Sequence, residues 1–264
     1  MKILIFCFLT FLTFTNLFSQ DTLLLDAGYI PNPDTSLVFI PDNYDESRAY
    51  PLVILLHGWS ANYKQWNDVA DMQSFANKYG FIIATPDGFY DSWYIDNPQK
   101  KNVQFETFFW DDFIPELFEN YNIDSAKVFI SGLSMGGHGA MMLFLKNPDF
   151  FLSAGSTSGI LDLTFFPERW SIKEGIGSIK IYPEEWEKNS AYHLLGSIAG
   201  LNKHIIFDCG TEDFAYAVNN RFREQCRNLN VKATFISQPG KHNYEYWSKS
   251  IEDHFEFFNN LIYK

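Results

Sequence analysis

Short runs of apolar residues, each bounded by turn-forming residues, recur along the chain and alternate with segments of helical periodicity. Continuous apolar runs of this kind are typical of strands that are buried on both faces of a mostly parallel sheet. The alternation predicts a three-layer α/β fold, with active-site residues at the carboxyl ends of the strands. The expected strands are residues 37–40, 52–56, 81–84, 128–131, 151–156, 204–208 and 233–236, and the expected helices are residues 68–79, 111–121, 136–145, 218–229 and 246–261.

Two of the expected connections are long and rich in aromatic residues, residues 87–109 and residues 160–203. Long ordered loops in compact domains tend to carry function. The alternative is a surface cover that packs its own aromatic side chains, and for residues 160–203 the sequence favours neither. No repeat or linker is visible, so residues 20–264 are expected to form one domain.

The chain begins with a positive start, Met1-Lys2, and an apolar run over residues 3–12, and Ser19 is a small residue suited to cleavage. This order is typical of a secretory signal peptide. We therefore expect residues 1–19 to be removed and the mature protein to be secreted or periplasmic. An uncleaved anchor is the alternative, but the run is shorter than the ~20 apolar residues that a spanning helix needs. No stable membrane anchor is expected after cleavage.

The composition excludes several classes of protein. The chain has 264 residues, of which 46% are hydrophobic, and this excludes a disordered chain. A formal net charge of −12 without a basic stretch disfavours nucleic-acid binding. No CxxC or HExxH motif points to a metal. Cys209 and Cys226 remain after signal removal, and we expect two buried thiols, although an exporting route would permit a bridge.

The strongest chemical motif is Gly132-Leu133-Ser134-Met135-Gly136, which lies between an expected strand and an expected helix. This context is the one that a nucleophile elbow requires. The serine is held in a strained backbone conformation that projects its hydroxyl above the sheet, and small neighbours let strand and helix approach closely. The helix dipole favours developing negative charge at this end. Ser134 is therefore the predicted nucleophile.

A serine hydroxyl needs a base and an acid that orients the base, in the chain order Ser, acid, His for this fold. Asp213 lies in the loop just beyond the strand 204–208, where the acid belongs. Asp208, within the strand run, and Glu212, one place earlier, are the rivals. Asp213 is the predicted acid.

The base is expected near the last strand. His242 follows the Gly/Pro turn after residues 233–236 and precedes the last helix. His254 lies inside that helix and is read as a surface or packing histidine. His138 lies on the elbow helix, and His193 and His204 precede the acid. His242 is therefore the predicted base.

The tetrahedral intermediate carries an oxyanion that two backbone N–H groups should bind. Met135 supplies one because it follows the nucleophile. Trp59 is expected to supply the other, because it lies in the turn after the strand 52–56 and Gly58 gives that backbone its freedom. The imidazole of His57 is read as structural. Trp59, Trp93 and Tyr94 could line an acyl or sugar subsite, and core packing is an equal alternative.

Together these residues resemble the esterase D/putative esterase family of α/β-hydrolases, which includes feruloyl and acetylxylan esterases. The resemblance covers residues 35–260 and rests on these features in order: Leu55-Leu56-His57-Gly58, Asp91-Ser92-Trp93-Tyr94, the segment 112–121, Gly132-Leu133-Ser134-Met135-Gly136-Gly137, Ser158-Gly159, Asp208-Cys209-Gly210-Thr211-Glu212-Asp213, and Gly240-Lys241-His242 followed by Tyr246-Trp247. It implies a carboxylesterase without a cofactor, with Ser134, Asp213 and His242 as the triad and Trp59 and Met135 as oxyanion donors. The family's substrates range from S-formylglutathione in cytosolic members to acylated polysaccharides and lipids in exported ones.

The sequence therefore predicts a secreted serine carboxylesterase that acts on a small-molecule or polysaccharide ester, with acetyl or feruloyl esters of carbohydrates as the expected class. The expected signal peptide argues against the cytosolic glutathione thioester. An acyltransferase, a peptidase or a thioesterase on the same triad is the alternative. A non-catalytic carbohydrate-binding protein is a third hypothesis, but such a protein would lack a triad member, and none is missing here.

Overall fold

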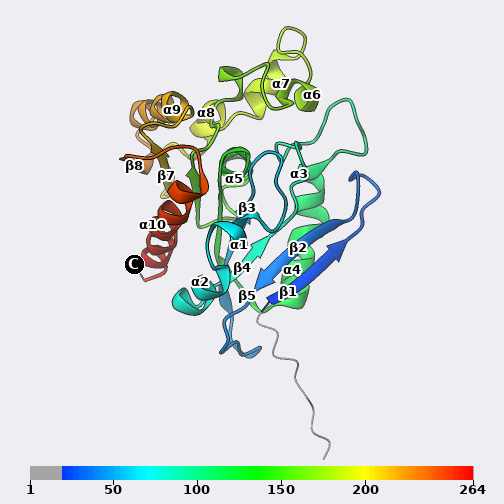
Figure 1. The fold of residues 1–264 in the computed structure, drawn as a ribbon, viewed down its shortest axis with the longest axis vertical. Coiled ribbons are helices and arrows are strands. Elements are labelled where there is room, and N and C mark those ends of the chain that lie inside the picture. The colour runs from blue at the N-terminus through cyan, green and yellow to red at the C-terminus, as the bar shows by residue number, and fades with distance from the viewer. Residues whose placement is uncertain (1–19, 264) are drawn as a thin grey trace, which may run out of the picture.

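An eight-stranded sheet runs through the centre of the computed structural model, which describes residues 20–263, and helices cover both of its faces (Figure 1). The strand order is β1-β2-β4-β3-β5-β6-β7-β8. β1 and β2 pair antiparallel, as do β2 and β4, and the other neighbours are parallel. The strands are β1 (Gln20–Leu25), β2 (Asp34–Phe39), β3 (Tyr50–Leu56), β4 (Ile82–Thr85), β5 (Ile123–Gly132), β6 (Ser153–Thr157), β7 (His204–Gly210) and β8 (Lys232–Gln238).

Each of the seven expected apolar runs contributes to a strand, and the mostly parallel α/β fold is confirmed. The sequence did not predict β1. This strand lies at one edge of the sheet and its residues alternate between exposed and half-buried. An edge strand does not need a continuous apolar run, so the pattern that marks the central strands is missing from β1.

The helices are α1 (Gln65–Val69), α2 (Met72–Tyr79), α3 (Phe105–Phe108), α4 (Ile114–Asn120), α5 (Met135–Lys146), α6 (Ile172–Ile176), α7 (Pro183–Lys188), α8 (Ala191–Leu194), α9 (Tyr216–Asn228) and α10 (Tyr244–Ile262). The single helix expected over residues 68–79 is two helices. The chain is extended at Ala70, and Asp71 begins α2 by accepting a hydrogen bond from the Ser74 N–H at 3.1 Å. The expected helix 111–121 is a π-helical turn, Phe109–Phe113, continued by α4.

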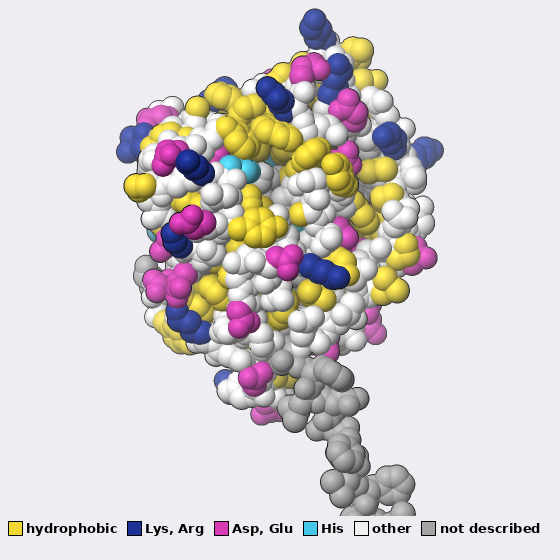
Figure 2. Space-filling model, in the orientation of Figure 1, with side chains coloured by type: hydrophobic (Ala, Val, Ile, Leu, Met, Phe, Trp, Pro, Cys, Tyr) yellow, Lys and Arg dark blue, Asp and Glu magenta, His cyan; other side chains and the backbone are white. Residues whose placement is uncertain are grey.

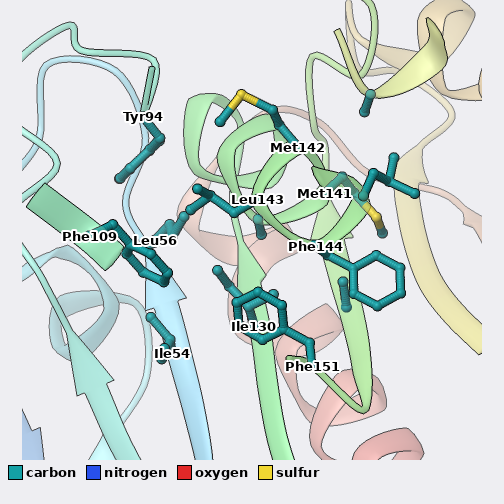
Figure 3. Packing of buried hydrophobic residues seen from close by; sticks show 14 of the residues in the cluster. Ile54, Leu56, Tyr94, Phe109, Ile130, Met141, Met142, Leu143, Phe144 and Phe151 are labelled. Carbon is teal, nitrogen blue, oxygen red and sulfur yellow. The ribbon is translucent and has the colours of Figure 1, made fainter. Parts of the chain in front are cut away.

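Alternate residues of the central strands face different helical layers. Leu52, Ile54 and Leu56 of β3 pack on the side of α4, α5 and α9, whereas Val53 and Leu55 pack on the side of α1, α2 and α10. Figure 3 shows Leu56 beside Leu143 of α5. Because α5 is buried along nearly its whole length, the residue that precedes it is held rigidly above the sheet.

Residues 1–19, the expected signal peptide, lie outside the described residues, so that expectation stays a prediction. Among residues 20–263, none of the helices is both long enough and apolar enough to cross a bilayer. Cys209 and Cys226 are buried free thiols, as the sequence predicted.

Candidate active site

The turn between β5 and α5 holds Ser134 in a strained conformation, with φ 55° and ψ −115°. A non-glycine residue in this region costs energy and persists only where its surroundings enforce it. Here they do. A Cβ on Gly132 would lie 2.2 Å from the Gly136 carbonyl oxygen, and a Cβ on Gly136 would lie 2.0 Å from the Leu56 carbonyl oxygen. The two glycines of the motif therefore allow the close approach of strand and helix that raises the serine.

Three predicted side chains meet at this turn. His242 Nε2 lies 2.9 Å from Ser134 Oγ, and His242 Nδ1 lies 2.9 and 3.0 Å from the two carboxylate oxygens of Asp213. The Asp213 side chain is fully buried and the His242 side chain is 17% exposed. With Nδ1–H donating to the carboxylate, Nε2 carries a lone pair that accepts the serine proton. The hydrogen-bond order is the one that a serine nucleophile requires.

The two rival acids have other partners. Glu212 is exposed and lies 3.7 Å from Lys241 Nζ. Asp208 is buried beside His254. Asp213 itself is fixed by the backbone, because its Oδ1 accepts the Ala215 N–H at 2.8 Å. Sequence and structure therefore agree on which carboxylate faces His242.

A second serine–histidine–aspartate set lies beneath the first. Ser131 Oγ lies 2.8 Å from His254 Nδ1, and His254 Nε2 lies 2.7 Å from Asp208 Oδ2. All three residues are fully buried. His254 is therefore a packing histidine that ties α10 to β5 and β7, and no substrate can reach Ser131 without unfolding.

Two backbone N–H groups beside Ser134 have no acceptor among the described residues. In the loop after β3, the N–H groups of Gly58, Ser60 and Ala61 are hydrogen-bonded, and that of Trp59 is not. At the elbow, the N–H groups of Ser134 and Gly136 are hydrogen-bonded, and that of Met135 is not. The unoccupied donors are thus the two that the sequence predicted for the oxyanion.

A cavity of about 170 Å³ opens at Ser134 and His242. Five of its lining residues are aromatic: Trp59, Trp93, Trp170, Phe214 and Trp247. Among the residues that the structure describes, neither a lysine nor an arginine lines it. Figure 2 shows hydrophobic side chains gathered around the histidine surface that is visible on this face of the molecule.

The structure separates the two adjacent aromatic residues that the sequence grouped. Trp93 lines the cavity, and its indole N–H donates to the Trp170 carbonyl oxygen at 2.9 Å. Tyr94 does not line the cavity. It is fully buried beside α5 (Figure 3), and its hydroxyl donates to the His57 carbonyl oxygen at 2.8 Å. Core packing therefore explains Tyr94.

Residues 160–203, which carry α6, α7 and α8, lie together above one end of the sheet (Figure 1) and contribute Ile160 and Trp170 to the cavity. Trp170 and Ser171 have φ values of 50° and 56°, so the chain turns sharply there. The Trp170 ring packs 5.1 Å from that of Phe214. This segment is therefore part of the site rather than a remote surface cover.

Sequence reasoning assigned no site role to Ile160, Trp170, Phe214 or Trp247. Phe214 and Trp247 contact His242, with ring centroids 4.3 and 5.0 Å apart. Phe214 directly follows the predicted acid, so its position next to Asp213 was a usable signal. Nothing local marks Trp170, because only the fold brings its segment to the elbow.

Asp34, the first residue of β2, is a buried carboxyl group whose pKa is shifted mainly by burial. The pKa of Asp34 is raised to about 8, with the Ser36 hydroxyl opposing the shift and the nearby charge of Asp87 adding to it. The Asp34 side chain accepts from Ser36 Oγ at 2.6 Å.

Across residues 20–263, no group of three or more His, Cys, Asp and Glu side chains is arranged so that it could hold a metal ion.

A strained serine, an imidazole and a buried carboxylate on an α/β sheet define a serine hydrolase. The chain belongs to the Esterase family, described as "Putative esterase", whose family profile matches residues 29–258. It is accordingly a carboxylic ester hydrolase.

Individual relatives are distant but cover most of the chain. The chain is 24% identical to an S-formylglutathione hydrolase of Bos taurus over 82% of its own length and 85% of the relative's. It is 24% identical to an acetyl esterase of Caldicellulosiruptor saccharolyticus, over 94% of its own length and 96% of the relative's. Its fold matches that of FphF, a fluorophosphonate-binding serine hydrolase of Staphylococcus aureus, with a TM-score of 0.78 and 22% identity. The match covers 91% of this chain and 98% of FphF.

Proposed function

We propose that this protein is an exported serine esterase that removes acyl groups, aromatic ones such as feruloyl in preference to acetyl, from carbohydrate esters. Ser134 attacks the ester carbonyl while His242 takes its proton, and Asp213 orients the imidazole and stabilises its charged form. The N–H groups of Trp59 and Met135 bind the oxyanion. A water molecule activated by His242 then hydrolyses the acyl-enzyme.

The observation that supports this proposal is the hydrogen-bond chain from Ser134 through His242 to Asp213 at the wall of an aromatic cavity. Every link is within 3.0 Å, so proton transfer needs no rearrangement. The export part of the proposal rests on residues 1–19 of the sequence alone.

The size of the cavity favours an aromatic acyl group. Its volume of about 170 Å³ is close to that of an apolar cavity of roughly 150 Å³ that binds benzene. An acetyl group would leave most of this space empty, and an empty apolar space contributes no dispersion contacts. Aromatic walls also suit the edges and faces of a phenolic ring.

A glutathione thioester fits this cavity poorly, although one relative is named S-formylglutathione hydrolase. Glutathione carries two carboxylates, and within residues 20–263 neither lysine nor arginine lines the cavity. The chain as a whole is also acidic, with a formal net charge of −12, which repels an anionic substrate at long range.

Labelling with a fluorophosphonate tests the nucleophile. The wild-type protein should be labelled at Ser134, and Ser134→Ala should lose both the label and hydrolysis of p-nitrophenyl acetate. Ser131→Ala is the matched control, because it removes a serine that is also hydrogen-bonded to a histidine. This control should keep label and activity. Retained activity in Ser134→Ala would reject the proposal.

A panel of esters tests the substrate class. Methyl ferulate and a feruloylated oligosaccharide should give a higher kcat/KM than the matching acetyl esters, and S-formylglutathione should give a low one. A preference for acetyl over feruloyl esters would overturn the aromatic-acyl part of the proposal and leave the mechanism intact.

A further inference from the structure

The imidazole of His57 lies next to the expected oxyanion site without touching Ser134. It is 1% exposed, and the Tyr94 hydroxyl donates to its backbone carbonyl. His57 Nδ1 lies 2.8 Å from the Gly58 carbonyl oxygen, and His57 Nε2 lies 2.8 Å from the Gly88 N. The side chain thus joins the loop after β3 to the loop after β4.

The two backbone partners of His57 determine which nitrogen carries the hydrogen. A carbonyl oxygen can only accept and a backbone N–H can only donate. Nδ1 must therefore carry the hydrogen that is donated to Gly58, and Nε2 must accept from Gly88. The Asp87 carboxylate lies farther from Nε2, at 3.3 Å, and accepts from the Phe89 N–H at 2.9 Å.

The Gly58 carbonyl belongs to the same peptide unit as the Trp59 N–H. In a planar trans peptide these two groups point in opposite directions. A carbonyl held toward His57 therefore turns the Trp59 N–H away from His57. This peptide lies beside the elbow, because a Cβ on Gly58 would be 3.5 Å from Ser134 Cβ and 2.8 Å from Leu133 Cδ1.

Other contacts do not fix this peptide as firmly. Gln65 Oε1 accepts the Gly58 N–H at 2.7 Å, but that N–H belongs to the preceding peptide unit. The Ala61 N–H also donates to the Gly58 carbonyl, at the longer distance of 3.2 Å. Because glycine tolerates a wide range of backbone angles, the 58–59 peptide can rotate unless its carbonyl is held.

We propose that His57 is a positioning residue that holds the 58–59 peptide in the orientation in which the Trp59 N–H can bind the oxyanion. The inference rests on the function proposed above and adds a residue that contacts no reacting atom. Without the imidazole, the peptide can turn its carbonyl oxygen toward the site, where it would repel the oxyanion.

A pair of variants of the same shape tests this role. His57→Asn keeps a donor at the place of Nδ1, and His57→Leu has a similar shape without a donor. His57→Leu should lower kcat about 10²-fold, as expected for one oxyanion donor, with KM nearly unchanged. His57→Asn should restore most of kcat. Thermal unfolding of each variant reports whether it folds.

The second readout compares an aryl ester with its thionoester, in which sulfur replaces the carbonyl oxygen. Sulfur is a weak hydrogen-bond acceptor, so the oxyanion donors favour the oxygen ester. His57→Leu should reduce the ratio of kcat/KM for oxygen ester over thionoester at least tenfold, and His57→Asn should keep most of it. General damage to the triad would slow both esters equally and leave the ratio unchanged.

An unchanged ratio in His57→Leu, or an equal loss in the Asn and Leu variants, would overturn the inference. Should His57→Leu fail to fold, His57→Gln replaces it, because its longer amide reaches toward Gly88 instead of Gly58. The Ser134→Ala enzyme is measured in the same series. Activity in that variant would reject the proposed function, whereas an unchanged ratio with an inactive Ser134→Ala would reject the role of His57 alone.

Discussion

The strain at Ser134 predicts an unusual order of stability for two inactive variants. At φ 55° and ψ −115°, an L-residue costs about 1–3 kcal/mol, and glycine does not bear this cost. Glycine loses more backbone entropy on folding, by about 0.5–1 kcal/mol relative to alanine. The difference leaves Ser134→Gly about 1 kcal/mol more stable than Ser134→Ala. Both variants lack the hydroxyl, so the comparison isolates the backbone.

Urea denaturation followed by circular dichroism measures both free energies of unfolding. Ser248 provides the control, because it lies in α10, where the backbone is an ordinary helix. There the order should reverse, with Ser248→Ala more stable than Ser248→Gly by about 0.5–1 kcal/mol. If Ser134→Ala were as stable as Ser134→Gly, the elbow would store no strain and the account of its two glycines would be wrong.

Two further predictions concern carboxyl groups. Asp213→Asn should lower kcat for p-nitrophenyl acetate about 10⁴-fold with little change in KM, because the amide favours the wrong imidazole tautomer, while Glu212→Gln stays near the wild-type rate. Asp34→Asn should flatten the pH dependence of stability. The folded wild type keeps the Asp34 proton up to about pH 8 and the unfolded chain releases it near pH 3.8, so wild-type stability falls between these values by up to about 1.4 kcal/mol per pH unit. Urea midpoints at pH 5 and pH 8 measure this fall, and parallel profiles of the two proteins would contradict it.

The central strands could be predicted from the sequence because burial on both faces leaves a continuous apolar run. The half-exposed edge strand β1 and the break at Ala70 could not, because tertiary contacts and not local pattern decide them. The three residues of the predicted triad could be located because each follows a strand in a chain order that the fold constrains. Their catalytic roles await the experiments above.

The walls of the cavity were harder to predict. Trp170 reaches the elbow through a segment without strands, so no periodicity in the sequence connects it with Ser134. Tyr94 presents a different difficulty, since the sequence does not distinguish an aromatic loop residue that faces the substrate from one that is buried in the core. His57 is similar, because its hydrogen bond to the next residue's carbonyl is visible only in three dimensions.

The segment between β6 and β7 leaves the sheet and returns to an adjacent strand, and those two strands pair in register through Gly155 and Ile206. Its two ends are therefore fixed by adjacent parallel strands, one at the carboxyl end of β6 and the other at the amino end of β7, while its interior supplies Trp170 to the cavity. Exchanging or lengthening this insertion alters the shape offered to the acyl group without moving β5, β7 or β8. Replacing this one segment can thus change the substrate preference while the strands that position Ser134, Asp213 and His242 stay the same.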